Sequence, residues 1–193
     1  MRASGPLLVV SAVLREQAAL RRRLGVGRGD RVRAGPGAWL AVTGDGAHRA
    51  EEGLARLVED LRPARVLVIG LAGGLSPDVE AGELLVGERV LGGTFARPAR
   101  ALAPWPAAGA RGATLVSASR IVARARDKAR LWTRLGRPRP AAVDLESNAY
   151  VDIAERAGIA LSILRVVSDA RDEDLPAEIS ASTDAHGAVR PWA

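Results

Sequence analysis

The most informative stretch of this chain is residues 66–86, VLVIGLAGGLSPDVEAGELLV. Its first four residues, Val66–Ile69, are apolar and mostly β-branched, which is typical of a buried strand. Gly70, Gly73 and Gly74 follow, and they predict a loop at the carboxyl end of that strand. Glycines there let the backbone approach a ligand closely, and ligands of open α/β sheets bind at these strand ends. The stretch therefore predicts a buried strand that leads into a binding loop.

Apolar runs and helical patterns alternate along the rest of the chain. The expected strands are Leu7–Val13, Trp39–Thr43, Val66–Ile69, Leu84–Val90, Ala113–Ser117 and Leu161–Val167. The expected helices are Glu16–Leu24, His48–Leu61 and Ser147–Ala157. In a chain of 193 residues this alternation predicts a single-domain three-layer α/β/α sandwich with a mixed central sheet. The stretch Gly92–Gly112, rich in proline, alanine and glycine, is expected to form a long surface loop.

The net charge of +6 does not by itself indicate a nucleic-acid-binding protein. The 28 basic residues comprise one lysine, Lys128, and otherwise arginines, which are scattered among 22 acidic residues. One Tyr and one Phe provide no platform on which the bases of a strand could stack. The chain has no Cys, and its two histidines, His48 and His186, are too far apart to form a metal-ligand motif. We therefore expect no nucleic acid partner and no metal.

The apolar run near the N-terminus, Leu7–Leu14, superficially resembles the core of a signal peptide. It is short, and Arg15 and Glu16 follow it at once, so a first buried strand explains it better. No run approaches the roughly 20 apolar residues that a membrane span needs. We expect a cytoplasmic protein without a membrane span.

A second stretch, VDLESNAYVDIAERAGIALSILRVVSD at Val143–Asp169, adds a second signature. Together the two stretches resemble the purine nucleoside phosphorylase and nucleosidase superfamily. The first matches its G-x-A-G-G-L-x-P…G-[DE]-[LI]-[LV]-V loop, and the second its V-[DE]-M-E-[SA]…R-x-[IV]-S-D pair. The resemblance spans Leu7–Pro176 and is nearest to the branch of methylthioadenosine/adenosylhomocysteine nucleosidases and hopanoid-associated phosphorylases. The hopanoid-associated group is nearest through SASRIVARARDKARLW at Ser117–Trp132 and the short DEDLP ending.

Cleavage of an N-ribosidic bond needs a proton for the leaving purine, stabilisation of the sugar cation and a nucleophile at the anomeric carbon. The resemblance implies that Asp169 donates the proton to purine N7, with Ser168 positioning it. It also implies that Glu146 accepts hydrogen bonds from the ribose hydroxyls and that Glu16 activates the attacking water. Each carboxylate has a structural alternative: a turn or helix cap for Asp169, a favourable helix-dipole charge for Glu146 and an exposed first turn for Glu16.

The resemblance also implies which residues surround the nucleoside. The purine is expected against Ala72 and Gly73, and the backbone of Ile121 and Val122 is expected to contact its edge. Relatives commonly have an aromatic residue where Ile121 stands, so the base loses a stacking contact worth about 1 kcal/mol. Leu145 replaces a methionine that packs under the ribose, and its apolar side chain keeps that role.

Two positions bear on whether water or phosphate is the nucleophile. In the hexameric phosphorylases an Arg two residues before the strand-end glycine and a Ser directly after it bind phosphate. Val68 and Leu71 occupy these positions and offer neither charge nor hydroxyl, although Arg15 or Arg49 remain alternative sources of charge. The sequence therefore favours hydrolysis, and inorganic phosphate takes part only if the protein is a phosphorylase.

The expected function is cleavage of the N-glycosidic bond of a purine nucleoside, a 5′-modified adenosine such as adenosylhopane, with release of adenine. The alternatives are a phosphate-dependent purine nucleoside phosphorylase and a catalytically silent nucleoside-binding protein. The nucleosidase branch further implies a homodimer and no organic cofactor.

Relatives usually continue into an amphipathic C-terminal helix beside the active site. After Pro176 the chain loses its hydrophobic rhythm, so we expect a single domain, residues 1–193, without that helix. Its absence would leave room for a large 5′ substituent. Whether the short ending is natural or a truncation stays open.

Overall fold

The computed structural model describes residues 5–92 and 99–176. Its strands are β1 (Leu7–Ser11), β2 (Arg31–Gly35), β3 (Ala38–Val42), β4 (Arg65–Gly74), β5 (Leu84–Gly92), β6 (Arg100–Ala101), β7 (Arg111–Ser117), β8 (Ala141–Asp144) and β9 (Ala160–Asp169). Its helices are the 3-10 helix η1 (Leu14–Gln17), α1 (Ala18–Leu24), α2 (Ala47–Leu61), α3 (Ala125–Arg134) and α4 (Ser147–Ala157).

The strands form one mixed sheet with β4 at its centre. The order is β2-β3-β1-β4-β8-β7-β5-β6, and β9 pairs with both β4 and β5. β4 runs parallel to β1 and β9, whereas its last two residues, Gly73 and Gly74, pair antiparallel with β8. Pairing then continues from β8 to β7, from β7 to β5 and from β5 to β9, so these strands close back on β4. The predicted α/β fold with a mixed central sheet is confirmed.

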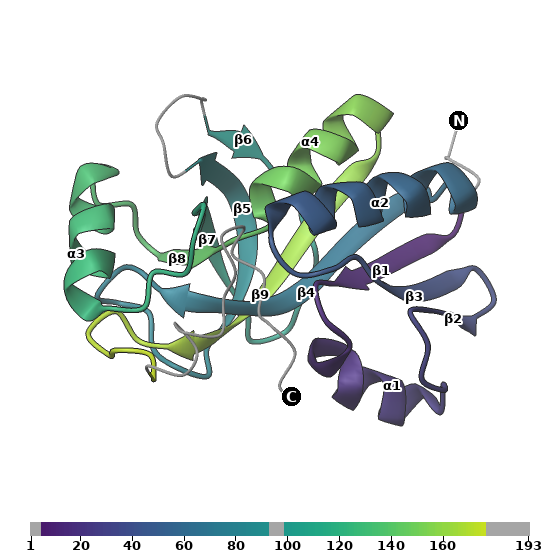
Figure 1. The fold of residues 1–193 in the computed structure, drawn as a ribbon, viewed down its shortest axis with the longest axis horizontal. Coiled ribbons are helices and arrows are strands. Elements are labelled where there is room, and N and C mark those ends of the chain that lie inside the picture. The colour runs from purple at the N-terminus through teal and green to yellow at the C-terminus, as the bar shows by residue number, and fades with distance from the viewer. Residues whose placement is uncertain (1–4, 93–98, 177–193) are drawn as a thin grey trace.

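Helices cover the sheet on more than one side (Figure 1). α2 and α4 lie side by side, and their apolar faces join the main hydrophobic core with Leu54, Leu57 and Tyr150. α1 packs elsewhere, where Leu20 contacts a smaller cluster on β1, β3 and β4. α3 adds Leu131 and Trp132 to a third cluster on β7 and β8. The helices therefore contribute to three separate hydrophobic clusters on the sheet.

The prediction of a loop directly after Ile69 is wrong, because β4 continues through all three glycines to Gly74. The reason is the partner strand: β9 pairs with β4 in register from Arg65 onward, and Gly73 opposes Asp169 after a bulge. Continuous pairing satisfies the backbone groups that a loop would expose to solvent. The glycines instead leave room for side chains that cross the strand, as described below.

Other boundaries differ less. The helix expected at 147–157 is confirmed, and the one expected at 48–61 begins one residue earlier. The helix expected from Glu16 begins as η1 before α1, and the first strand ends at Ser11. β2, β8 and α3 were not expected. The region 92–112 is partly a loop, with the short β6 in it and the start of β7 at its end, and 93–98 lie outside the described residues.

Among the helices in the described ranges, none is long and apolar enough to cross a membrane. The expected lack of a C-terminal helix concerns residues 177–193, which lie outside the described residues.

Candidate active site

The three candidate carboxylates come from three separate elements that meet near the carboxyl end of β4. Glu16 lies in η1, Glu146 directly precedes α4, and Asp169 is the last residue of β9. Glu146 and Asp169 are buried, with 7% and 5% of their surface exposed. Buried carboxylates need partners, so the hydrogen bonds of each one indicate what it can do.

A buried arginine organises this region. Arg165, on β9, is 1% exposed, and its Nε donates a hydrogen bond of 2.8 Å to Oδ2 of Asp144 at the end of β8. Asp144 also accepts a hydrogen bond of 3.1 Å from the backbone N–H of Ser147 and one from the Ser147 hydroxyl. These bonds fix the turn between β8 and α4, in which Leu145 and Glu146 lie.

The charge of Arg165 is stabilised by several acids. Burial acts against the charged form, but Asp144 and Glu146 outweigh it and raise the pKa of Arg165. Glu16 acts in the same direction. We refer to Arg165, Asp144, Glu146 and Glu16 as the Arg165 cluster.

Glu16 reaches the backbone of β4. Its Oε1 accepts a hydrogen bond of 3.0 Å from the N–H of Leu71, and its Oε2 accepts one of 3.2 Å from the N–H of Val13. The bond from Val13 lies within the first turn of the helix, as expected if Glu16 has only a structural role. The bond from Leu71 instead connects Glu16 to β4. A Cβ atom on Gly70 would lie 2.7 Å from Oε1 of Glu16 and would also meet Nη1 of Arg165. Gly70 therefore leaves the space in which the two side chains approach each other.

Glu146 changes its charge near neutral pH. Burial and the negative charge of Asp144 raise its pKa to about 7, against the lowering effect of Arg165 and of a backbone hydrogen bond. That bond, 3.0 Å long, runs from the N–H of Gly46 to Oε1 of Glu146. The turn before α2 is thereby tied to the start of α4.

Asp169 does not cap a helix. Its Oδ1 accepts a hydrogen bond from the Ser168 hydroxyl, and its Oδ2 accepts one from Nζ of Lys128. Its carboxylate lies over β4, because a Cβ atom on Gly73 would stand 3.2 Å from Oδ2. The Ser168 hydroxyl also lies 3.3 Å from the carbonyl oxygen of Ala72, which is a second possible acceptor for its single hydrogen. Four of the predicted residues, Ala72, Gly73, Ser168 and Asp169, are thus brought together.

Ile121 and Val122 lie between β7 and α3 and are partly buried. With Leu145 they line a cavity of about 1180 Å³ that extends along α3. Four arginines also line this cavity: Arg120, Arg124, Arg130 and Arg134. None of the three candidate carboxylates lines this cavity. We place the chemistry at the carboxylates, where the buried hydrogen bonds converge, and regard the cavity as the space beside it.

Three residues of this region were not expected from the sequence to belong to the site: Lys128, Asp144 and Arg165. Arg165 and Asp144 stand inside the second quoted signature, but only the fold shows that they are paired and buried. One feature of the sequence could have drawn attention to Lys128: it is the only lysine in a chain rich in arginine. Across residues 5–92 and 99–176, no group of three or more His, Cys, Asp or Glu side chains could hold a metal ion.

Comparisons with known proteins bear on the family and the fold of the chain. Residues 31–111 match the Phosphorylase superfamily. No curated protein matches the chain. Among solved structures, the 5′-methylthioadenosine/S-adenosylhomocysteine nucleosidase of Neisseria meningitidis, in complex with methylthio-immucillin-A, has a TM-score of 0.73 and 21% identity, covering 88% of this chain and 87% of that chain.

Two Helicobacter pylori structures are also similar. Its 5′-methylthioadenosine/S-adenosylhomocysteine nucleosidase has a TM-score of 0.69 at 17% identity and covers 88% of this chain and 87% of that one. Its futalosine hydrolase has a TM-score of 0.67 at 16% identity, with coverages of 86% and 88%. The chain therefore has the fold of these nucleosidases, and its residues 31–111 match the Phosphorylase superfamily.

Proposed function

We propose that this protein is an enzyme that cleaves the N-glycosidic bond of a purine nucleoside with water. The observation that carries the proposal is the meeting of Glu16, Glu146 and Asp169, from three elements, around the carboxyl end of β4. Two carboxylates that flank a scissile glycosidic bond are the usual equipment for its hydrolysis. The third carboxylate would bind the ribose.

In the proposed reaction Glu16 takes a proton from water as the water oxygen attacks the anomeric carbon. The bond from that carbon to the purine nitrogen breaks, and its electron pair goes to the purine. Asp169 must first take up a proton from solvent, and it then gives this proton to N7 of the purine, which leaves as the neutral base. Glu146 accepts hydrogen bonds from the ribose hydroxyls and favours the positive charge that develops on the sugar.

The charges around Arg165 favour water over phosphate. Arg165 is already paired with Asp144, and Glu16 and Glu146 add further carboxylates. A phosphate dianion placed here would be repelled by these groups. Val68 is fully buried in the core, and the N–H of Leu71 is used by Glu16. A phosphorylase therefore remains the second candidate, with the arginines of the adjoining cavity as its source of positive charge.

The substrate proposed here is an adenosine with a large 5′ substituent, of which adenosylhopane is the specific candidate. The cavity of about 1180 Å³ is lined by Ile121 and Val122, the expected purine contacts, and by Leu145, the expected ribose contact, so it supports a bound nucleoside. The large 5′ substituent is proposed on the sequence resemblance alone. A cytoplasmic homodimer is proposed on the sequence resemblance alone. The non-enzymatic alternative is a protein that binds a nucleoside without cleaving it.

The test is adenine release by the wild-type protein and by Asp169→Asn. We expect release from adenosine, methylthioadenosine or adenosylhopane, and a loss of 100-fold or more in kcat in the variant, as is typical when a general acid is removed. Asp172→Asn is the matched control, because this exposed residue follows three positions later. Full activity of Asp169→Asn would contradict the assigned acid. Binding without release in the wild type would favour the silent protein.

A further inference from the structure

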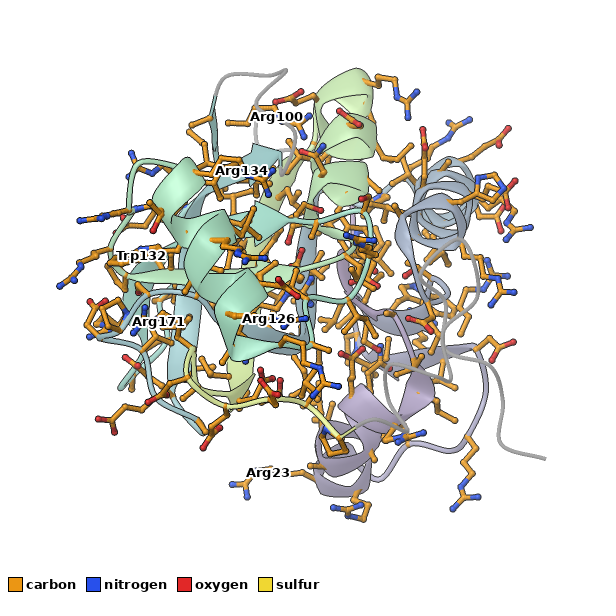
Figure 2. The ribbon with its side chains drawn as sticks, turned by 60° about the vertical axis from the view of Figure 1, so that its left-hand side comes forward. Arg23, Arg100, Arg126, Trp132, Arg134 and Arg171 are labelled. Carbon is orange, nitrogen blue, oxygen red and sulfur yellow. The ribbon has the colours of Figure 1, made fainter. Side chains whose placement is uncertain are left out.

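Lys128 is an unusual lysine. Its side chain on α3 is 0% exposed. By contrast, the side chains of Arg126 and Arg130 on the same helix are 76% and 77% exposed. Figure 2 shows Arg126 and Arg134 at the two ends of α3. An ammonium group taken out of water destabilises the fold unless acceptors meet its hydrogens.

All three donors of Lys128 have an acceptor. Nζ donates to Oδ2 of Asp169, to the carbonyl of Ala170 at 2.7 Å and to the carbonyl of Glu173 at 2.8 Å. The three acceptors surround one point, which suits a compact ammonium group better than the planar fork of an arginine. Lys128 therefore binds the end of β9 and the segment that follows it.

Further contacts hold the same segment against α3 independently of Lys128. Asp174 accepts a hydrogen bond of 2.8 Å from the N–H of Ala125, and the N–H of Leu175 donates to the carbonyl of Ala123 at 2.8 Å. The guanidinium carbon of Arg171 lies 5.6 Å from the centre of the Trp132 ring. Figure 2 labels both residues. Lys128 is therefore one of several contacts that dock the segment, and the contact that sets it apart from the others is with the carboxylate of Asp169.

We infer that Lys128 is a positioning residue for Asp169, an inference that rests on the proposed function. Ser168 holds Oδ1 and Lys128 holds Oδ2, so the carboxyl group is fixed against Gly73. When Asp169 passes its proton to the purine, it becomes a carboxylate that is only 5% exposed. The ammonium group of Lys128 stabilises this carboxylate as it forms, which favours protonation of the leaving purine.

The test compares two leaving groups. Methylthioadenosine needs a proton on its purine, whereas 4-nitrophenyl β-D-riboside releases a phenolate that leaves without one. We expect Lys128→Met to lower kcat for adenine release about 100-fold. We expect the same variant to change kcat for nitrophenolate release, and KM for both substrates, less than about threefold. Equal losses on both substrates would show a merely structural role and overturn the inference.

Two further variants keep the result interpretable. Arg126→Met removes an exposed charge from the same helix and should retain wild-type kcat on both substrates. In Asp169→Asn, the added change Lys128→Met should lower kcat no further, because Lys128 acts through Asp169. This double variant removes both charges of the pair, so it also serves if Lys128→Met alone does not fold. An additional loss of tenfold or more in the double variant would contradict the inference, whereas a wild type that cleaves neither substrate would contradict the proposed function itself.

Discussion

Arg165 and Asp144 form a 2.8 Å ion pair between side chains that are 1% and 2% exposed. The pair joins β9 to β8 across the end of β4, and the Ser147 hydroxyl and N–H complete the coordination of Asp144. The turn that holds Glu146 is therefore set by a buried electrostatic contact rather than by apolar packing alone.

Removing one partner of this pair should destabilise the fold strongly. Arg165→Met leaves the carboxylate of Asp144 buried without its counter-charge, and we expect the free energy of unfolding to fall by about 3–5 kcal/mol. Urea denaturation measures this. Arg31→Met is the control, because the pair of Arg31 with Asp60 is exposed and should contribute less than about 1 kcal/mol. Similar losses of free energy of unfolding in the two variants would contradict the claim that burial makes the pair of Arg165 and Asp144 important for stability.

The raised pKa of Glu146 predicts how stability depends on pH. The unfolded chain ionises this group above pH 4.5, whereas the folded protein keeps its proton up to about pH 7. Between these values the folded state binds the extra proton, so the free energy of unfolding falls as the pH rises. The fall is on the order of 1–3 kcal/mol and is complete above about pH 7. Glu146→Gln should lack this fall in urea denaturation at pH 5 and 8, whereas Glu59→Gln, an exposed control, should retain it.

The same group should control nucleoside binding in the opposite direction. Below about pH 7 Glu146 takes up a proton, and a neutral carboxyl accepts hydrogen bonds from ribose hydroxyls more weakly than a carboxylate does. We expect KM to rise as the pH falls from 8 to 6. In Glu146→Gln, KM should be high at every pH. A variant whose KM keeps the wild-type pH profile would exclude Glu146 as the ribose ligand.

Gly70 should tolerate no side chain. An alanine Cβ would lie 2.7 Å from Oε1 of Glu16 and would also meet Arg165, so both side chains must move. We expect Gly70→Ala to lower kcat at least tenfold and to destabilise the fold by about 1–3 kcal/mol. Gly27→Ala is the control, because a Cβ atom there has no neighbour within 4 Å. Initial-rate assays and thermal unfolding of the two variants measure both effects.

Much of the fold could be predicted from the sequence, because its strands and helices carry strong apolar periodicity. The continuation of β4 through Gly70, Gly73 and Gly74 could not, since glycine has low strand propensity and the paired residues of β9 lie 95 positions further along the chain, as in Arg65 with Ala160. The helix α3 was not predicted because charged residues dominate its sequence, and of its apolar residues only Leu131 and Trp132 are buried.

The candidate carboxylates were identified from motifs, but their partners were not. The ion pair of Arg165 with Asp144 and that of Lys128 with Asp169 join segments that are distant in sequence. No local pattern specifies which of many charged side chains becomes buried. The structure supplies that information through β9, which carries both Arg165 and Asp169 to the centre of the sheet.

The decisive measurement is adenine release from methylthioadenosine with and without inorganic phosphate. We expect release at the same rate in both conditions, with free methylthioribose as the second product. We also expect a loss of 100-fold or more in Glu16→Gln, since this residue would take the proton of the water. Release only in the presence of phosphate, with methylthioribose 1-phosphate as the product, would contradict the assignment of water as the nucleophile.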